Sequence, residues 1–237
     1  MTDIESCSKD QTKYMTSFSN VIEEEAESLL GFKFYEFYYY QTPIEQFITT
    51  IAPEQLKKKI FERLIDCILS EGFPEGTILP INESVVTDNV GIILQAIVSY
   101  HKLTMNRNDF ILLREKQIIS KNEQFGGNME FIIAQTTNVE NTRYVLVVEP
   151  KSDSLGKGLT QLLLVLKSIW DINNDNKMVY GLLTTGINWQ LVTYDGQSWK
   201  LSEPSTVLLA NMRKQEDRWL KNNTQILDVI YSILSSI

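Results

Sequence analysis

The sequence contains a single histidine and only two cysteines among 237 residues. Cys7 and Cys67 are too few for a disulfide framework or a four-thiolate zinc site, which indicates a reducing compartment. His101, as the only imidazole, excludes every mechanism that needs two histidines. Any metal site must therefore be built from oxygen ligands. We expect His101 to be a structural residue rather than a catalytic base.

The sequence also lacks a long apolar run. No stretch approaches the ~18 consecutive apolar residues of a membrane helix. The polar N-terminus has neither the basic nor the apolar region of a secretory signal. With 43% hydrophobic and 22% charged residues, the composition is typical of a globular protein that buries a full core. We therefore expect no membrane association and an intracellular location, cytoplasmic or nuclear.

Positive charge is scarce, because 22 Lys and Arg residues face 30 Asp and Glu residues and the net charge is −8. Such acidity argues against a nucleic-acid partner, for which a basic surface is typical. However, residues 1–50 hold 9 acidic and 3 basic residues, net −6, which leaves −2 for residues 51–237. We predict an acidic N-terminal extension over 1–50 and one nearly neutral domain over 51–237. The charge of that domain neither supports nor excludes DNA binding.

The extension is also rich in aromatic side chains. Seven of the nine residues in 32–40 are aromatic, and an acidic run over 23–27 precedes them. Such a strip can stack on bases or bind a protein partner. The alternative, which is the usual role of large aromatic residues, is a segment that covers the core of the following domain.

Apolar periodicity predicts the helices and strands of the rest of the chain. The expected helices are 53–72, 83–102, 159–172, 205–221 and 224–237, and the expected strands are 109–119, 128–138, 142–151, 177–186 and 188–196. Loops at Gly126-Gly127 and at 138–141 would make the first three strands an antiparallel meander. The strand–helix–strand unit over 142–184 implies a parallel pair, and hence a mixed α/β sheet.

Charged residues follow the most apolar strand. The run 144–148 is apolar throughout, which is typical of a central strand that is covered on both faces. Glu149 and Lys151 are two residues apart, so in an extended chain their side chains leave the same face. At the end of a buried strand such charges must pair or hold an ion. A simple structural ion pair at the strand's exit is the alternative to a functional site.

Glu130 joins this pair if 128–138 and 142–151 form a hairpin, because the start of one strand then meets the end of the next. Two carboxylates, a backbone carbonyl and waters suit the octahedral coordination of Mg²⁺. Such an ion could activate water and stabilise charge on a phosphodiester. The amine of Lys151 would orient the nucleophile or neutralise the developing anion.

In these residues the sequence resembles the PD-(D/E)XK nuclease superfamily, which has the restriction endonuclease-like fold. The resemblance covers about residues 80–200. It rests on Glu149-Pro150-Lys151 as the E-x-K element, on Glu130 in place of the usual Asp, and on the closing hairpin VYGLLTTGINWQLVTYDG. It implies a mixed β-sheet core flanked by helices, and hydrolysis of DNA with Mg²⁺ or Mn²⁺ as the cofactor.

The resemblance also implies roles for individual residues. The catalytic set would be Glu130, Glu149, Lys151 and Gln161, the last of which lies on the helix after the E-x-K strand. The metal would be contacted by Glu83, Glu130, Glu149 and the carbonyl of Pro150. For Glu83 the alternative is a first-turn glutamate that the helix dipole favours.

Two residues depart from the family pattern. Glu130 is one methylene longer than the usual Asp, which matters because Mg²⁺ demands near-ideal geometry. Pro150 has no N–H, so it predicts a bulge or a local end of strand pairing. Asp109 is a rival for the acidic position, but it lies one strand too early.

These departures favour a second hypothesis, in which the nuclease fold is kept as a protein- or nucleic-acid-binding module. In that case the acidic, aromatic extension would engage a protein partner. A third hypothesis is that the motif arose by chance in an unrelated α/β domain.

Overall fold

A computed structural model describes residues 13–74, 83–136, 141–152 and 155–237. The helices are α1 (Glu23–Leu30), α2 (Glu54–Glu71), α3 (Glu83–Thr104), α4 (Leu155–Asn173), α5 (Glu216–Asn222) and α6 (Gln225–Ser235). The strands are β1 (Thr16–Ser17), β2 (Phe110–Ile119), β3 (Phe125–Thr136), β4 (Thr142–Pro150), β5 (Val179–Thr184), β6 (Asn188–Tyr194), β7 (Trp199–Leu201) and β8 (Ser205–Thr206). Short 3₁₀ helices form at η1 (Phe18–Asn20), η2 (Phe34–Tyr38), η3 (Ile44–Phe47) and η4 (Met212–Lys214).

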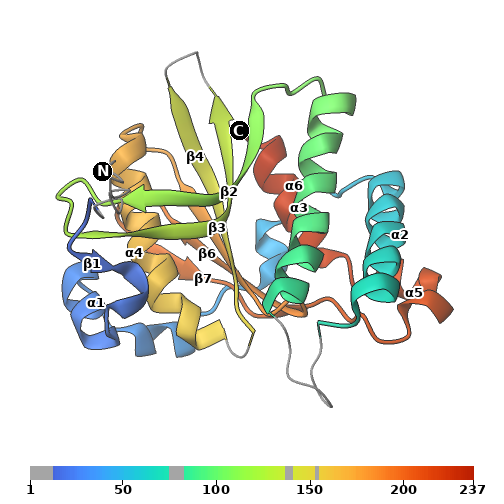
Figure 1. Ribbon diagram of the computed structural model, residues 1–237, viewed down its shortest axis with the longest axis horizontal. Helices are drawn as coiled ribbons and strands as arrows, with labels where there is room; N and C mark the ends of the chain where they lie inside the picture. Colours follow the sequence, from blue (N-terminus) through green and yellow to red (C-terminus); the bar gives the residue numbers. More distant parts are fainter. Residues whose placement is uncertain (1–12, 75–82, 137–140, 153–154) are drawn as a thin grey trace, which may run out of the picture.

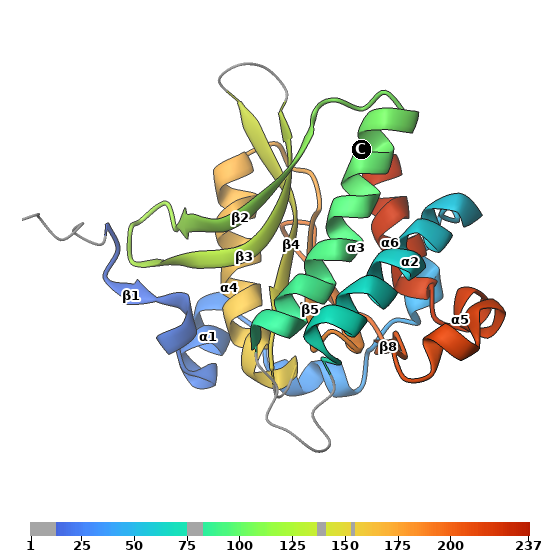
Figure 2. The same cartoon turned by 45° about the vertical axis from the view of Figure 1, so that its right-hand side comes forward.

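An eight-stranded mixed sheet lies between two helical layers, which confirms the predicted α/β class (Figures 1 and 2). The segment with α1, together with α4, covers one face, and α2, α3 and α6 cover the other. Successive β5 residues alternate between the two cores, since Leu182 packs on the α3 side and Leu183 on the α4 side. Within the described residues, no helix is both long enough and apolar enough to cross a membrane.

The central strand is β4. The strand order is β1-β3-β4-β5-β6-β7, with β2 paired to β3 and β8 paired to β6. β4 runs antiparallel to β3 and parallel to β5, which the chain reaches through α4. All four residues of 145–148 are at most 1% exposed. The predicted central strand and the predicted parallel pair are therefore confirmed.

The expected turn at Gly126-Gly127 is wrong, because both glycines lie inside β3. The turn comes earlier, where Ser120 N–H donates to the carbonyl of Phe125. Gly126 pairs with Ser17 of β1, and a Cβ at this position would lie 2.3 Å from the ring of Tyr14. Glycine is needed here for the close approach of another segment rather than for a turn. Most of the loop expected at 138–141, and Cys7, lie outside the described residues.

The helix expected over 205–221 is wrong in its first part. Residues 205–206 form β8, and only Glu216–Asn222 is α-helical. β8 pairs with β6 through Ser205 and Trp189, so pairing with a strand distant in sequence overrides the local apolar spacing. The indole N–H of Trp219 then donates to the carbonyl of Leu208 at 2.8 Å, which ties α5 to this irregular segment.

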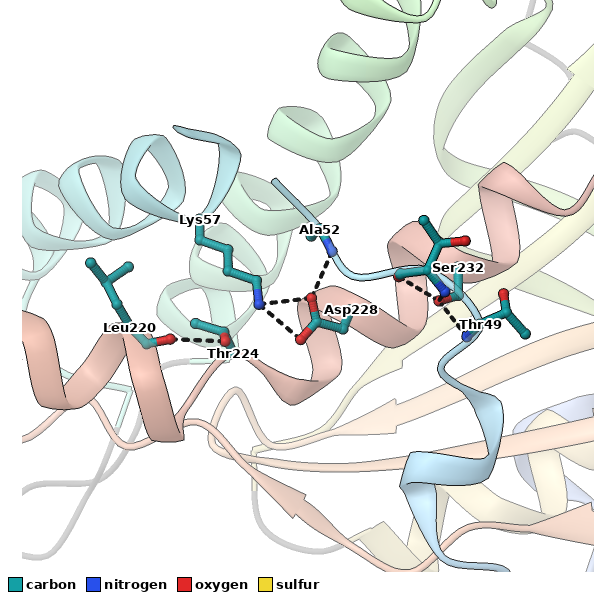
Figure 3. A network of polar contacts seen from close by, with 8 residues as sticks. Thr49, Ala52, Lys57, Leu220, Thr224, Asp228 and Ser232 are labelled. Atoms are coloured by element: carbon teal, nitrogen blue, oxygen red, sulfur yellow. Dashed lines mark hydrogen bonds and ion pairs between the residues drawn. The ribbon is translucent and has the colours of Figure 1, made fainter. Parts of the chain in front are cut away.

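A buried polar network joins the segment before α2 to α6 (Figure 3). The amine of Lys57 lies 2.8 Å from Oδ1 of Asp228, and both residues are at least nine-tenths buried. The N–H of Ala52 donates to the same carboxylate at 2.8 Å, and the N–H of Thr49 donates to Oγ of Ser232 at 3.0 Å. These bonds hold the chain against α6 at the point where it enters α2.

This network predicts that mutation of Lys57 lowers the stability of the protein far more than mutation of its neighbour Lys58. Lys57→Met should destabilise the protein by about 3 kcal/mol, because it leaves the carboxylate of Asp228 buried without its partner charge. Lys58→Met should change stability by no more than about 0.5 kcal/mol, since its exposed contact with Glu216 spans 3.9 Å. Urea unfolding of both variants measures the difference. Equal losses would contradict the importance of the network.

Candidate active site

Glu149 and Lys151 form an ion pair at the carboxyl end of β4. The amine of Lys151 donates to Oε1 of Glu149 at 2.7 Å and to Oε1 of Gln161 on α4 at 3.4 Å. The predicted exit of both side chains from one face of the strand is thereby confirmed. Glu149, Lys151 and Gln161 thus meet between β4 and α4. Lys151 is 2 residues from Glu149 and 10 residues from Gln161 in sequence.

The Glu149 carboxylate is incompletely satisfied. Its residue is 6% exposed, and its Oε2 is buried with no hydrogen-bond partner in the structure. Burial raises the pKa of Glu149 and the nearby charge of Glu130 adds to this rise, whereas Lys151 and the side chain of Gln161 lower it. A buried oxygen without a partner is an unused acceptor position at the centre of the site.

Glu130 and Glu149 follow the end of the β3–β4 ladder. The last pair of the ladder is Phe131 with Val148, and Glu130 and Glu149 are each one residue beyond it. Opposite residues in an antiparallel ladder point to the same face of the sheet. Burial raises the pKa of Glu130, with Arg114 lowering it and Glu115 and Glu83 raising it further. The expected convergence of the two carboxylates therefore agrees with the register.

Glu83 lies at the start of α3, the helix on the opposite face of the sheet from α4. It opens α3 and is exposed, and its charge contributes to the raised pKa of Glu130. The end of β4 and the starts of α3 and α4 all lie at the lower edge of the molecule in Figures 1 and 2. Pro150, the last residue of β4, is buried and pairs with Thr184 of β5. Pairing of β4 with β5 continues through Pro150, so the local end of pairing predicted there is found only on the β3 side, where the last pair is at Val148.

The end of β4 carries oxygen atoms of the kind that bind divalent cations. Across the described ranges, no group of three or more His, Cys, Asp or Glu side chains is placed to hold a metal ion. The unpartnered Oε2 of Glu149 nevertheless fits a cation, because a carboxylate oxygen is a ligand that Mg²⁺ and Mn²⁺ accept. Glu130, one residue beyond the last β3–β4 pair, and the backbone carbonyl of Pro150 are the further oxygen donors at this end of β4.

Arg114 is a charged neighbour that sequence reasoning missed. Its guanidinium lies 5.0 Å from the ring centroid of Phe131 and 3.8 Å from Oδ1 of Asp88 on α3. It lowers the pKa of Glu130. No motif spacing marks Arg114, because its position depends on the pairing of β2 with β3, which is irregular at Glu115 where φ is +49°.

Two residues considered from the sequence lie outside the site. Asp109, the rival acidic residue, binds Arg107 through two hydrogen bonds of 3.0 Å, so its carboxylate is engaged elsewhere. His101 is 1% exposed and packs against the rings of Phe110 and Tyr231. The structural interpretation of His101 agrees with this packing.

No protein-family model matches the sequence, and no curated protein matches it at a significant level.

Two glycines at the start of α4 give a test of the packing around Lys151. A Cβ at Gly158 would lie 2.8 Å from Cδ2 of Leu183 and 3.3 Å from Cγ and Cε of Lys151, whereas nothing lies within 4 Å of a Cβ at Gly156. Gly156→Ala should stabilise the protein by up to about 1 kcal/mol through helix propensity. Gly158→Ala should destabilise it, because the added methyl group crowds Leu183. Urea unfolding compares the two, and stabilisation by both would contradict the crowding.

Because His101 is buried, we expect the stability of the protein to fall at acidic pH. Burial, followed by Arg107, lowers the pKa of His101 to about 4, with Asp109 opposing the change. Between about pH 6.5 and 4 the unfolded chain binds a proton that the folded protein does not, so stability should fall as the pH is lowered through this window. His101→Phe should flatten the dependence there. Urea midpoints measured from pH 7 to pH 4 test this, and an unchanged slope in the variant would contradict it.

Proposed function

We propose that this chain is a metal-dependent nuclease that hydrolyses phosphodiester bonds in DNA. The observation that carries the proposal is the ion pair of Glu149 and Lys151 at the end of the buried strand β4, with Glu130 one residue beyond the last β3–β4 pair. Charges are unfavourable at such a position unless they pair or bind an ion. The Glu149 oxygen without a partner favours a bound ion over a purely structural pair.

The topology supports the finer assignment to a restriction endonuclease-like fold. The helix α3, the meander β2–β3–β4, the crossover helix α4 and the hairpin β5–β6 follow one another along the chain. The E-x-K residues lie at the end of the central strand of this sheet. The order of elements and the place of the motif are thus compatible with PD-(D/E)XK nucleases.

In this proposal Glu130, Glu149 and the carbonyl of Pro150 would hold Mg²⁺ or Mn²⁺, with Glu83 as a supporting residue. The ion would supply an activated water and charge stabilisation on the phosphodiester. Lys151 would bind the developing anion or the attacking water through its amine. Gln161, which accepts a hydrogen bond from that amine at 3.4 Å, would position it.

A second function is favoured by the lack of a metal-ligand group among the described residues. The part of the chain that the structure describes contains no group of three acidic ligands, and the amine of Lys151 is bound to Glu149 at 2.7 Å. An ion pair whose two charges neutralise each other fits a nuclease fold that no longer cleaves DNA and acts as a binding module.

Two matched lysine variants test the nuclease proposal. The wild-type protein should cleave plasmid or single-stranded DNA in the presence of Mg²⁺ or Mn²⁺. Lys151→Met should lower the cleavage rate by at least about 10²-fold, because it removes the cation beside the reacting phosphate. Lys167→Met should retain the activity, since the amine of Lys167 is bound to Asp171 at 2.6 Å farther along α4. The measurement is the initial rate of cleavage with each metal.

Two outcomes would contradict the proposal. One is equal cleavage by wild-type protein and Lys151→Met. The other is a folded wild-type protein that cleaves neither substrate and whose melting temperature does not change with Mn²⁺, which would instead support the binding module.

A further inference from the structure

The aromatic strip over 32–40 divides into buried and exposed residues. Phe34 and Phe37 are each 7% exposed and belong to the core on the α4 side of the sheet. Tyr38, Tyr39 and Tyr40 are 84%, 76% and 75% exposed. The interpretation of the strip as core cover therefore fits the phenylalanines but not the tyrosines, which need another explanation.

The exposed tyrosines belong to a well-anchored segment. The N–H of Phe34 donates to Oε1 of Glu27 at 2.8 Å, and the amine of Lys33 donates to Oε2 of the same carboxylate at 2.7 Å. Phe32 stacks on Trp199 of β7 with ring centroids 6.0 Å apart. The backbone that presents the tyrosines is thus held against α1 and against the sheet, so little further ordering is needed when the rings bind a partner.

The segment that carries these rings is acidic. Residues 13–50 contain Glu23, Glu24, Glu25, Glu27, Glu36 and Glu45, but only Lys13 and Lys33 among the basic types. The amine of Lys33 is already paired with Glu27. Glu23, Glu24, Glu25 and Glu36 are exposed, and Glu36 lies between the tyrosines in η2. The segment therefore presents a net negative charge to a partner.

From this combination we infer that the tyrosine surface, defined as Glu23–Glu25, Tyr35, Glu36 and Tyr38–Tyr40, docks a basic segment of a partner protein. Tyrosine faces attract guanidinium and ammonium groups, and the carboxylates pair with the same cations. Tyrosine is also enriched at protein interfaces, whereas a nucleic acid would bring phosphates against the carboxylates. The expected partner segment contains several Arg or Lys residues.

This inference does not depend on the nuclease proposal. Its residues are different from Glu130, Glu149 and Lys151, and the two proposals can fail separately. Docking by the tyrosine surface would be measured without metal and without DNA cleavage.

Selection of peptides on the full chain tests the inference. A phage library of random 12-residue peptides would be selected on immobilised wild-type protein, and the enriched peptides would be synthesised and measured by fluorescence anisotropy. We expect enrichment in Arg and Lys. Replacing Tyr38, Tyr39 and Tyr40 by Ser should weaken binding at least tenfold, and so should replacing Glu23, Glu24 and Glu25 by Gln.

Two control variants separate the role of the rings from general effects. Replacing the three tyrosines by Phe keeps the ring faces, so it should retain binding to within about threefold. Replacing the exposed Leu69, Leu103 and Leu208 by Ser removes apolar surface elsewhere and should leave binding unchanged. Melting temperatures of all variants show whether each remains folded.

Several outcomes would overturn the inference. These are the absence of any enrichment, enrichment of acidic peptides, or binding that the tyrosine-to-serine variant retains. Tighter tyrosine-dependent binding of a dT15 oligonucleotide than of any selected peptide would assign the surface to single-stranded nucleic acid instead. Tyrosine-dependent self-association in sedimentation experiments would assign it to a second copy of the chain.

Discussion

The pairing of β4 with antiparallel β3 on one side and parallel β5 on the other organises the sheet and both helical layers. A strand in this position is covered on both faces, so residues 145–148 must be apolar. The parallel pairing with β5 requires a crossover, and α4 supplies it. The two helical layers then bury the two faces of the sheet that β4 organises.

The candidate site forms where β4 ends. Glu149 is still buried where β4 stops, so its charge needs the amine of Lys151 at 2.7 Å. Glu130 follows the last β3–β4 pair on the neighbouring strand. Burial raises the pKa of both carboxyl groups, and the charge of Glu130 adds to the rise at Glu149. The arrangement places unfavourable negative charge and one unused carboxylate oxygen next to a lysine. This is the physical basis for proposing a cation there.

The N-terminal segment adds a second kind of surface to the same fold. Its phenylalanines extend the core on the α4 side, while its tyrosines point outward from an anchored turn. The acidic residues of α1 belong to the same segment as the exposed rings, so the segment carries net negative charge. Buried phenylalanines and exposed tyrosines thus occur together within the nine positions 32–40.

Features that depend on local spacing could be predicted from the sequence. Apolar periodicity was sufficient for α2, α3, α4 and the central strand, and the two-residue spacing of Glu149 and Lys151 was sufficient for their shared face. Features that depend on pairing between distant segments became visible only in the folded chain. Gly126 faces β1 rather than forming a turn, β8 replaces the start of a predicted helix, and Arg114 reaches the site through an irregular β2–β3 ladder. Such contacts leave no local pattern, because the two partners are separated by many residues and neither constrains the periodicity of the other.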